Sequence, residues 1–530
     1  MLQDNLLLII SLLFVVSMLA MLSNKLHISY PIFLVIAGLA ISLVPGIPMM
    51  RLEPDIVFVI FLPPLLYSAA WYTSWHDFWK MRRAIGMLAF GLVIFTSCAV
   101  AVVSNFIIPD FSLACGFLLG GIISPPDAVA ATSVLQNLKM PKRVVTVLEG
   151  ESLVNDASSL IVFRFALLTI FTGKFILWKA GVDFASVVSL GILIGLVIGN
   201  IVYAMHRWLP TTPSIDTVIT LLSPYLMYIT AEHFHASGVL AVVSGGLFVS
   251  YRAHEIFSYS SRLQSQSVWN VVVFLLNGVV FILIGLQLPG IVKDLGEYSL
   301  HAAILYGVVI SLVTILIRIA WVFPGAYLPR ICSKRIRLKE IDPGWKAIFV
   351  VGWSGMRGVV SLASALAIPL MLSNGTPFPH RNLILFITFV VILFTLVLQG
   401  LTLPYIIRRL DITVKENEEE QRLSIRLRLA TAALEYINTS YSKESESIDA
   451  FNRLKARYER MVEITGKRLE SEEGDEVAPA FLPRYRQLLL ELVDIQRKEL
   501  SHMRRDAEYG EELLRSKEFE LDLEEARFRR

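Results

Sequence analysis

Charge is scarce in this sequence, and the charge that is present is concentrated near one end. Only 18% of the 530 residues are Asp, Glu, Lys or Arg, whereas a soluble globular protein contains about a quarter. Residues 411–530 hold 22 basic and 28 acidic residues, and the 410 residues before them hold 26 and 17. This distribution excludes one uniform soluble domain. It predicts an apolar body of net charge +9, residues 1–410, and a polar tail of net charge −6, residues 411–530.

Three further absences narrow the class of protein. Cys98, Cys115 and Cys332 have neither the number nor the spacing of a disulfide framework or a metal site, so we expect unpaired thiols. Only Asp4 is charged before the apolar run Leu6–Leu22. A cleaved signal peptide needs a basic start, so this run is expected to be a retained membrane helix. Basic and aromatic residues are not interleaved, so no nucleic-acid partner is expected.

Long apolar runs fill the first 410 residues. A membrane-spanning helix needs about 20 mostly apolar residues, and the mean hydropathy of the whole chain is +0.61. We therefore predict an all-α polytopic membrane protein with 13 transmembrane helices. The predicted spans are 5–22, 28–44, 55–72, 84–107, 112–134, 148–172, 181–205, 214–232, 236–251, 268–290, 299–328, 345–371 and 383–408.

The loops between these spans differ in basic content. The loops that would lie on one side of the membrane hold 15 Lys and Arg residues, and those on the other side hold 5. Because basic loops remain in the cytoplasm, we expect the N-terminus outside and the tail in the cytoplasm, in a plasma or inner membrane protein.

The fifth predicted span contains the sequence Ser124-Pro-Pro-Asp127. Pro125 and Pro126 remove two backbone donors and clash with the preceding turn, so the helix should break here. Broken backbone is tolerated in a membrane only where protein or a water-filled cavity surrounds it. Asp127 would then lie at the positive end of a half-helix, as its cap.

The sixth predicted span places several oxygen-bearing side chains at helical spacing. Ser152 and Asp156 are four residues apart and share one face, as do Glu151 and Asn155. At 1.5 Å per residue, Asp156 would lie roughly 12 Å along the helix from its cytoplasmic end, at a depth comparable to that of Asp127. Hydroxyl, amide and carboxylate oxygens are hard ligands that suit a small cation, so we predict an ion site here.

Arg357 lies near the middle of the twelfth predicted span, in the sequence Gly352-Trp-Ser-Gly-Met-Arg-Gly358. A buried arginine requires a carboxylate partner, and Glu151 is the candidate. Pairing with Asp127 or Asp156 is also compatible with the sequence. The glycines should weaken this helix near its middle, as the prolines do in the fifth span. Paired discontinuous helices in the two halves of a chain indicate inverted repeats, here spans 1–6 and 8–13.

At these residues the sequence resembles the sodium/hydrogen exchanger branch of the monovalent cation:proton antiporters, in its bacterial form. The similar stretches are 61–66, 124–130, 149–156 and 352–361. Their order and spacing cover most of residues 1–410. The resemblance implies a secondary active antiporter that exchanges Na⁺, or Li⁺ or K⁺, for protons by alternating access. It also implies a homodimer and no cofactor.

The resemblance further implies roles for individual residues. Asp156 would bind the cation or protons, Asp127 would lie beside it at the helix crossing, and Ser152 would help to ligate the ion. Asn155 would occupy the place where electrogenic relatives have a second Asp, so exchange is expected to be electroneutral. Glu151 and Arg357 would form a structural ion pair.

Two positions depart from the family pattern. Pro126-Asp127-Ala128 stands where relatives often have Thr-Asp-Pro, so a hydroxyl ligand is missing. Ser68 stands where many relatives have an acidic residue.

Two other classes of protein remain as alternatives to an antiporter. An ion channel would need a continuous pore, usually built from several subunits. An intramembrane aspartyl hydrolase could use Asp127 and Asp156 as its carboxylate pair, but it would not explain the paired broken helices.

The tail is expected to form two helical units separated near Glu472–Pro483.

Overall fold

The computed structural model describes residues 2–26, 28–44, 57–135, 138, 140–173, 177–296, 298–332, 344–372, 375–412, 418–441, 448–470, 481–506 and 511–529. Every regular element in these ranges is a helix, as the apolar runs predict. The chain divides into two compact units, Met1–Val414 and Lys415–Arg530.

The first unit is a bundle of apolar helices. Its elements are α1 Leu2–Leu26, α2 Tyr30–Ser42, η1 Val57–Phe61, α4 Leu62–Tyr72, α5 Trp75–Gly86, η2 Met87–Leu92, α6 Val93–Ile107, α7 Leu113–Ile123, α8 Ala128–Leu135, α9 Lys142–Thr172, α10 Leu177–Trp208, α11 Pro213–His233, α12 Gly238–Tyr251, α13 Ala253–Ile256, α14 Tyr259–Leu286, α15 Leu288–Lys293, α16 Leu300–Cys332, α18 Gly344–Trp353, α19 Val359–Leu366 and α20 Arg381–Leu410.

Each predicted span coincides with one helix or with consecutive helices of this unit. Eight stretches of the described residues are long and apolar enough to cross a membrane, and three shorter apolar helices accompany them. The predicted spans 214–232 and 345–371 correspond to α11 and to α18 with α19. The unit is therefore a multi-pass membrane protein, and the count of 13 stays a prediction.

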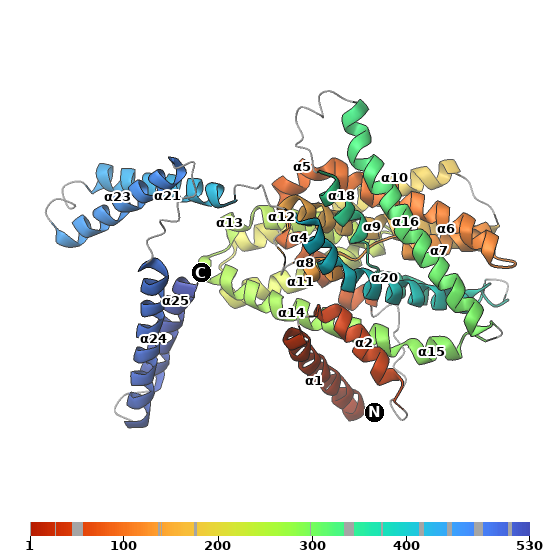
Figure 1. The fold of residues 1–530 in the computed structure, drawn as a ribbon, viewed down its shortest axis with the longest axis horizontal. Coiled ribbons are helices and arrows are strands. Elements are labelled where there is room, and N and C mark those ends of the chain that lie inside the picture. Colours follow the sequence, from red (N-terminus) through yellow and green to blue (C-terminus); the bar gives the residue numbers. More distant parts are fainter. Residues whose placement is uncertain are drawn as a thin grey trace. The chain divides into compact units, whose positions relative to one another are not determined.

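Two helices of this unit are interrupted. The first interruption separates α7 from α8 at Ser124–Asp127, where the prolines predict it, and the second separates α18 from α19 at Ser354–Gly358. The half-helices α8 and α18 both pack against α9, and Figure 1 shows the three together in the interior of the unit. A large buried apolar cluster with members on α7, α9, α16 and α20 surrounds them. The two interruptions are thus enclosed by protein, which makes their unpaired backbone tolerable in a membrane.

The second unit consists of amphipathic helices. They are α21 Glu418–Ser440, α23 Asp449–Glu470, α24 Phe481–Asp506 and α25 Glu511–Arg529. α21 packs against α23, and α24 packs against α25. Arg497 of α24 forms ion pairs with Asp522 and Glu525 of α25, both at 2.5 Å. The unit is helical, as predicted, and most of the predicted separator Glu472–Pro483 lies outside the described residues.

Candidate functional site

The two interruptions cross each other and are joined by a backbone hydrogen bond. The Asp127 N–H donates to the Met356 carbonyl oxygen at 2.7 Å. The Asp127 carboxylate accepts the Val129 N–H at 2.8 Å, which caps the half-helix α8 in the way its position predicts. Each broken helix therefore satisfies a backbone group of the other, and the carboxylate of Asp127 is fixed at the crossing.

Side chains of α9 hold the first interruption in place. The Asn155 amide donates to the Pro126 carbonyl at 3.0 Å, and the Ser152 hydroxyl accepts the Ala128 N–H at 3.3 Å. The Asn155 Oδ1 is buried and accepts no hydrogen bond from the residues that the structure describes. Asn155 thus supplies a donor to the Pro126 carbonyl, which the interruption leaves outside both half-helices, and its Oδ1 stays available.

Asp156 follows Asn155 on α9, and its side chain is only 7% exposed. Asp127 lies within electrostatic reach of it, so the two carboxylates repel when both are charged. A buried carboxylate is costly unless a cation or a proton neutralises it. Asp127, Ser152, Asn155 and Asp156 therefore lie in one neighbourhood, and their side chains carry oxygen atoms of the kind that small monovalent cations and protons bind.

Glu151 forms its ion pair with Arg318 of α16, and the predicted pairing with Arg357 is wrong. Arg318 Nη1 lies 2.5 Å from Glu151 Oε1, and Nη2 lies 2.8 Å from Oε2. Both side chains are almost completely buried. Arg318 also donates from Nε and Nη2 to the Val351 carbonyl, at 3.3 Å and 3.1 Å. One guanidinium therefore joins α9, α16 and the half-helix α18.

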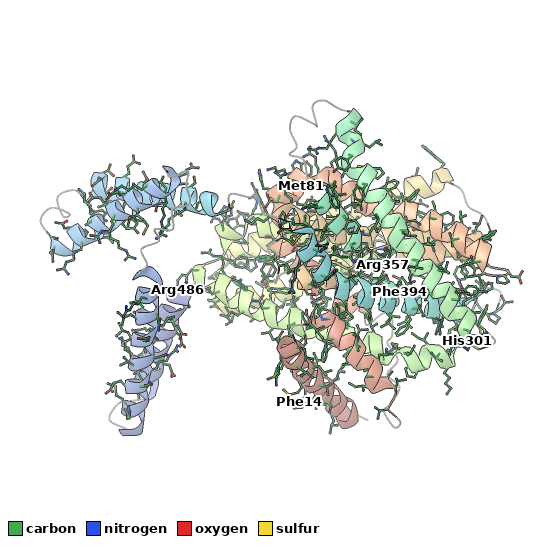
Figure 2. The ribbon with its side chains drawn as sticks, viewed as in Figure 1. Phe14, Met81, His301, Arg357, Phe394 and Arg486 are labelled. Atoms are coloured by element: carbon green, nitrogen blue, oxygen red, sulfur yellow. The ribbon has the colours of Figure 1, made fainter. Side chains whose placement is uncertain are left out.

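Arg357 instead binds backbone that the interruptions leave unpaired. Its Nε donates to the Ile123 carbonyl at the end of α7, at 3.0 Å, and Nη1 donates to the Gly355 carbonyl. Figure 2 shows Arg357 deep within the membrane unit. Glu151 pairs with Arg318, and not with Arg357, because the Arg318 guanidinium binds both Glu151 oxygens. Arg357 donates instead to carbonyls at the interruptions.

The signal for Arg318 is present in the sequence. It lies between Ile317 and Ile319, within the predicted span 299–328. Like Arg357, Arg318 is a charge far from either end of an apolar run, which indicates a functional or structural role in a membrane protein. Of the two departures from the family pattern, Pro126 lies at the crossing, and Ser68 is buried within α4.

Gly358 leaves room for the Asp127 carboxylate. Its φ of −142° is accessible to any residue, but an added Cβ would overlap the Asp127 carboxylate and Cβ. We expect Gly358→Ala to separate the two interruptions, lower stability by about 1–3 kcal/mol and greatly reduce exchange. Thermal unfolding and transport assays check this. Gly290→Ala, on α15 with open space around it, is the control, and normal exchange by Gly358→Ala would contradict the packing argument.

Comparison with known proteins is consistent with this arrangement. Residues 9–409 match the family model described as sodium/hydrogen exchanger, transmembrane. An uncharacterised Na⁺/H⁺ exchanger of Mycobacterium tuberculosis strain H37Rv is 31% identical over 95% of this chain and 92% of its own length. A sodium, potassium, lithium and rubidium/H⁺ antiporter of Bacillus pumilus is 30% identical over 79% of this chain. This chain spans 64% of that relative's length.

The fold also has a solved counterpart. The sodium proton antiporter MjNhaP1 of Methanocaldococcus jannaschii superimposes with a TM-score of 0.61, at 18% identity, over 77% of this chain and 99% of its own. At this identity the likeness concerns the fold alone. Together with the match over residues 9–409, it assigns the chain: the protein belongs to the sodium/hydrogen exchanger family of membrane antiporters.

Proposed function

We propose that this chain exchanges a monovalent cation for a proton at the Asp127–Asp156 site by alternating access. The observation that supports this proposal is the Asp127 carboxylate at the crossing of two interrupted helices, with the buried Asp156 of α9 within its electrostatic reach. Discontinuous helices of this kind form the ion sites of inverted-repeat transporters. Sodium is the first candidate cargo, and lithium and potassium are alternatives, since the Bacillus pumilus relative is named for all three.

The chemistry of exchange follows from competition for the same oxygen atoms. The Asp156 carboxylate binds either a cation or a proton, because both neutralise it in the same place. The Asp127 carboxylate, the Ser152 hydroxyl and the unpaired Asn155 Oδ1 complete the coordination of a cation. A site that holds neither a cation nor a proton leaves a buried charge uncompensated, which disfavours the change from one access state to the other. Movement of a cation in one direction then requires movement of a proton in the other.

We also propose that exchange is electroneutral, one cation for one proton. Asn155 carries no ionisable group, so it adds no second proton to the cycle. Moving one net charge is worth about 2.3 kcal/mol per 100 mV, so an electrogenic cycle would respond strongly to membrane potential. The sodium gradient that balances a fixed pH difference should therefore be the same at zero and at large potential in proteoliposomes.

The potential is set with potassium and valinomycin. It is then set again with a lipophilic cation, since potassium is itself a candidate cargo. Liposomes without protein give the background. No coupled movement of sodium and protons at any potential would contradict antiport and favour the channel alternative, and a balance point that shifts with voltage would contradict the role given to Asn155. The hydrolase alternative is set aside, because the family consists of transporters.

The placement of the protein in the cell is part of the same proposal. The excess of basic residues in one set of loops supports a cytoplasmic tail and an outside N-terminus in the plasma or inner membrane. The resemblance to bacterial exchangers supports a homodimer and a role in pH homeostasis. The two helix pairs of residues 415–530 would then lie on the side where proton and sodium concentrations are regulated.

A further inference from the structure

One face of α20 is turned toward the second interruption. The Thr395 hydroxyl accepts the Arg357 N–H at 3.1 Å, and the Thr402 hydroxyl accepts the Trp353 indole N–H at 3.0 Å. The first contact is with a residue of the unwound segment Ser354–Gly358, and the second is with Trp353, the last residue of α18. Gln399 is four residues after Thr395 and three before Thr402, so it shares their face. Its side chain is therefore presented to the unwound segment itself.

The Gln399 side chain is completely buried, and neither its Oε1 nor its Nε2 has a hydrogen-bond partner within the described residues. The Ser354 hydroxyl, on the unwound segment, is buried and unpaired in the same sense. The next residue, Gly400, lies between α2 and the unwound segment, since a Cβ added to it would overlap the Ile32 side chain and come 3.7 Å from the Met356 Sδ. Two buried polar side chains without partners thus lie on the two elements that meet here, Gln399 on α20 and Ser354 on the unwound segment.

Gln399 differs from the threonines on the same face. Thr395 and Thr402 donate to carbonyls of their own helix, Val391 at 2.8 Å and Leu398 at 2.6 Å, so burial leaves them satisfied. A buried amide without partners is unfavourable compared with an apolar side chain of the same shape. An amide offers one acceptor and a pair of donors together, which match the hydroxyl, N–H and C=O groups of unwound backbone.

We propose that Gln399 is a positioning residue for exchange. Its amide binds the Ser354 hydroxyl and the adjoining unwound backbone as the crossing rearranges between its two access states, and it thereby sets the rate of that rearrangement. This inference rests on the proposed alternating-access exchange. Gln399 acts on the crossing, and not on the cation, because the cation site is formed by side chains of α9 and by Asp127.

The test replaces the amide with an apolar side chain of similar shape, Gln399→Met. The thermal unfolding temperature should stay the same or rise, because an unpaired buried amide is removed. Maximal turnover should fall by about tenfold, as expected for one hydrogen bond made only during the rearrangement. The apparent KM for sodium should change by less than about twofold, since the substitution does not alter the side chains that bind sodium. Ser354→Ala should lower turnover similarly, and the double variant should lose no more than either single variant.

The matched control is Thr388→Val. Thr388 also lies on α20, farther from the interruption, and its hydroxyl is completely buried and has no partner among the described residues. Its turnover should equal that of the unaltered protein. Normal turnover in a stable Gln399→Met protein would overturn the inference while leaving the proposed function intact. Strictly additive effects of the two substitutions would overturn the predicted contact. Absence of exchange in the unaltered protein would overturn the proposed function and this inference together.

Discussion

Asp156→Asn is expected to abolish cation-driven proton movement while the protein folds normally. Asparagine has nearly the same size and shape as aspartate, so the buried position on α9 can accommodate it. It cannot take up or release a proton in the physiological range, and its neutral oxygen is a weaker ligand for a cation. Proton transfer and cation binding should therefore both be lost at this side chain.

The measurement is sodium-induced proton movement in proteoliposomes that contain equal amounts of folded protein. Asp110→Asn is the matched control, since Asp110 is exposed and lies outside the helices. Its φ of 56° is one that asparagine adopts readily. The control should exchange normally. Near-normal exchange by a well-folded Asp156→Asn protein would show that the ion binds elsewhere.

Removal of the Arg318 side chain should give the largest loss of stability among these variants. In Arg318→Met the Glu151 carboxylate stays buried without the guanidinium that pairs with it, and the Val351 carbonyl loses two donors. Breaking a buried pair on one side costs about 3–5 kcal/mol. The unfolding temperature and folded yield in detergent should both fall sharply. Adding Glu151→Gln should recover a large part of the loss, because the uncompensated charge is removed.

The chain offers a surface pair for comparison. Arg164 and Glu232 are also joined at 2.8 Å, but their side chains are 47% and 35% exposed. Solvent screens such pairs, which contribute about 0–1 kcal/mol. Arg164→Met should therefore change stability little. If Arg318→Met is equally harmless, or if the losses from Arg318→Met and Glu151→Gln simply add, the buried pair does not join α9 to α16 as described.

The parts of the site that the sequence predicts well are those encoded by local rules. Pro125 and Pro126 prevent a continuous helix whatever surrounds them, so the interruption falls where expected. The spacing of Ser152 and Asp156 along one helix is equally local. Their meeting with Asp127 required only that two neighbouring spans reach comparable depth, and α7–α8 and α9 are adjacent in the chain.

The parts that the sequence does not settle depend on how distant helices are rotated. Glu151 could face Arg318 or Arg357, because both lie far from the ends of apolar runs on helices from the second half. The choice depends on which guanidinium reaches both carboxylate oxygens. The other arginine then binds the carbonyls that the interruptions release, and no spacing rule in a single sequence distinguishes the two.

The separation of these contacts along the chain has a consequence for biogenesis. Arg357 contacts the Ile123 carbonyl across 234 residues, and Arg318 contacts Glu151 across 167. When only the first half of the chain has been synthesised and inserted, Glu151 is in the membrane without the positive charge of Arg318. The Ile123 carbonyl then also lacks its donor, Arg357. Until the second half is inserted, the early helices therefore lack the partner of Glu151 and a donor to the Ile123 carbonyl. Insertion of the second half completes these contacts within the same chain. Truncated products that end before α16 should be recognised by membrane quality control through this unpaired charge.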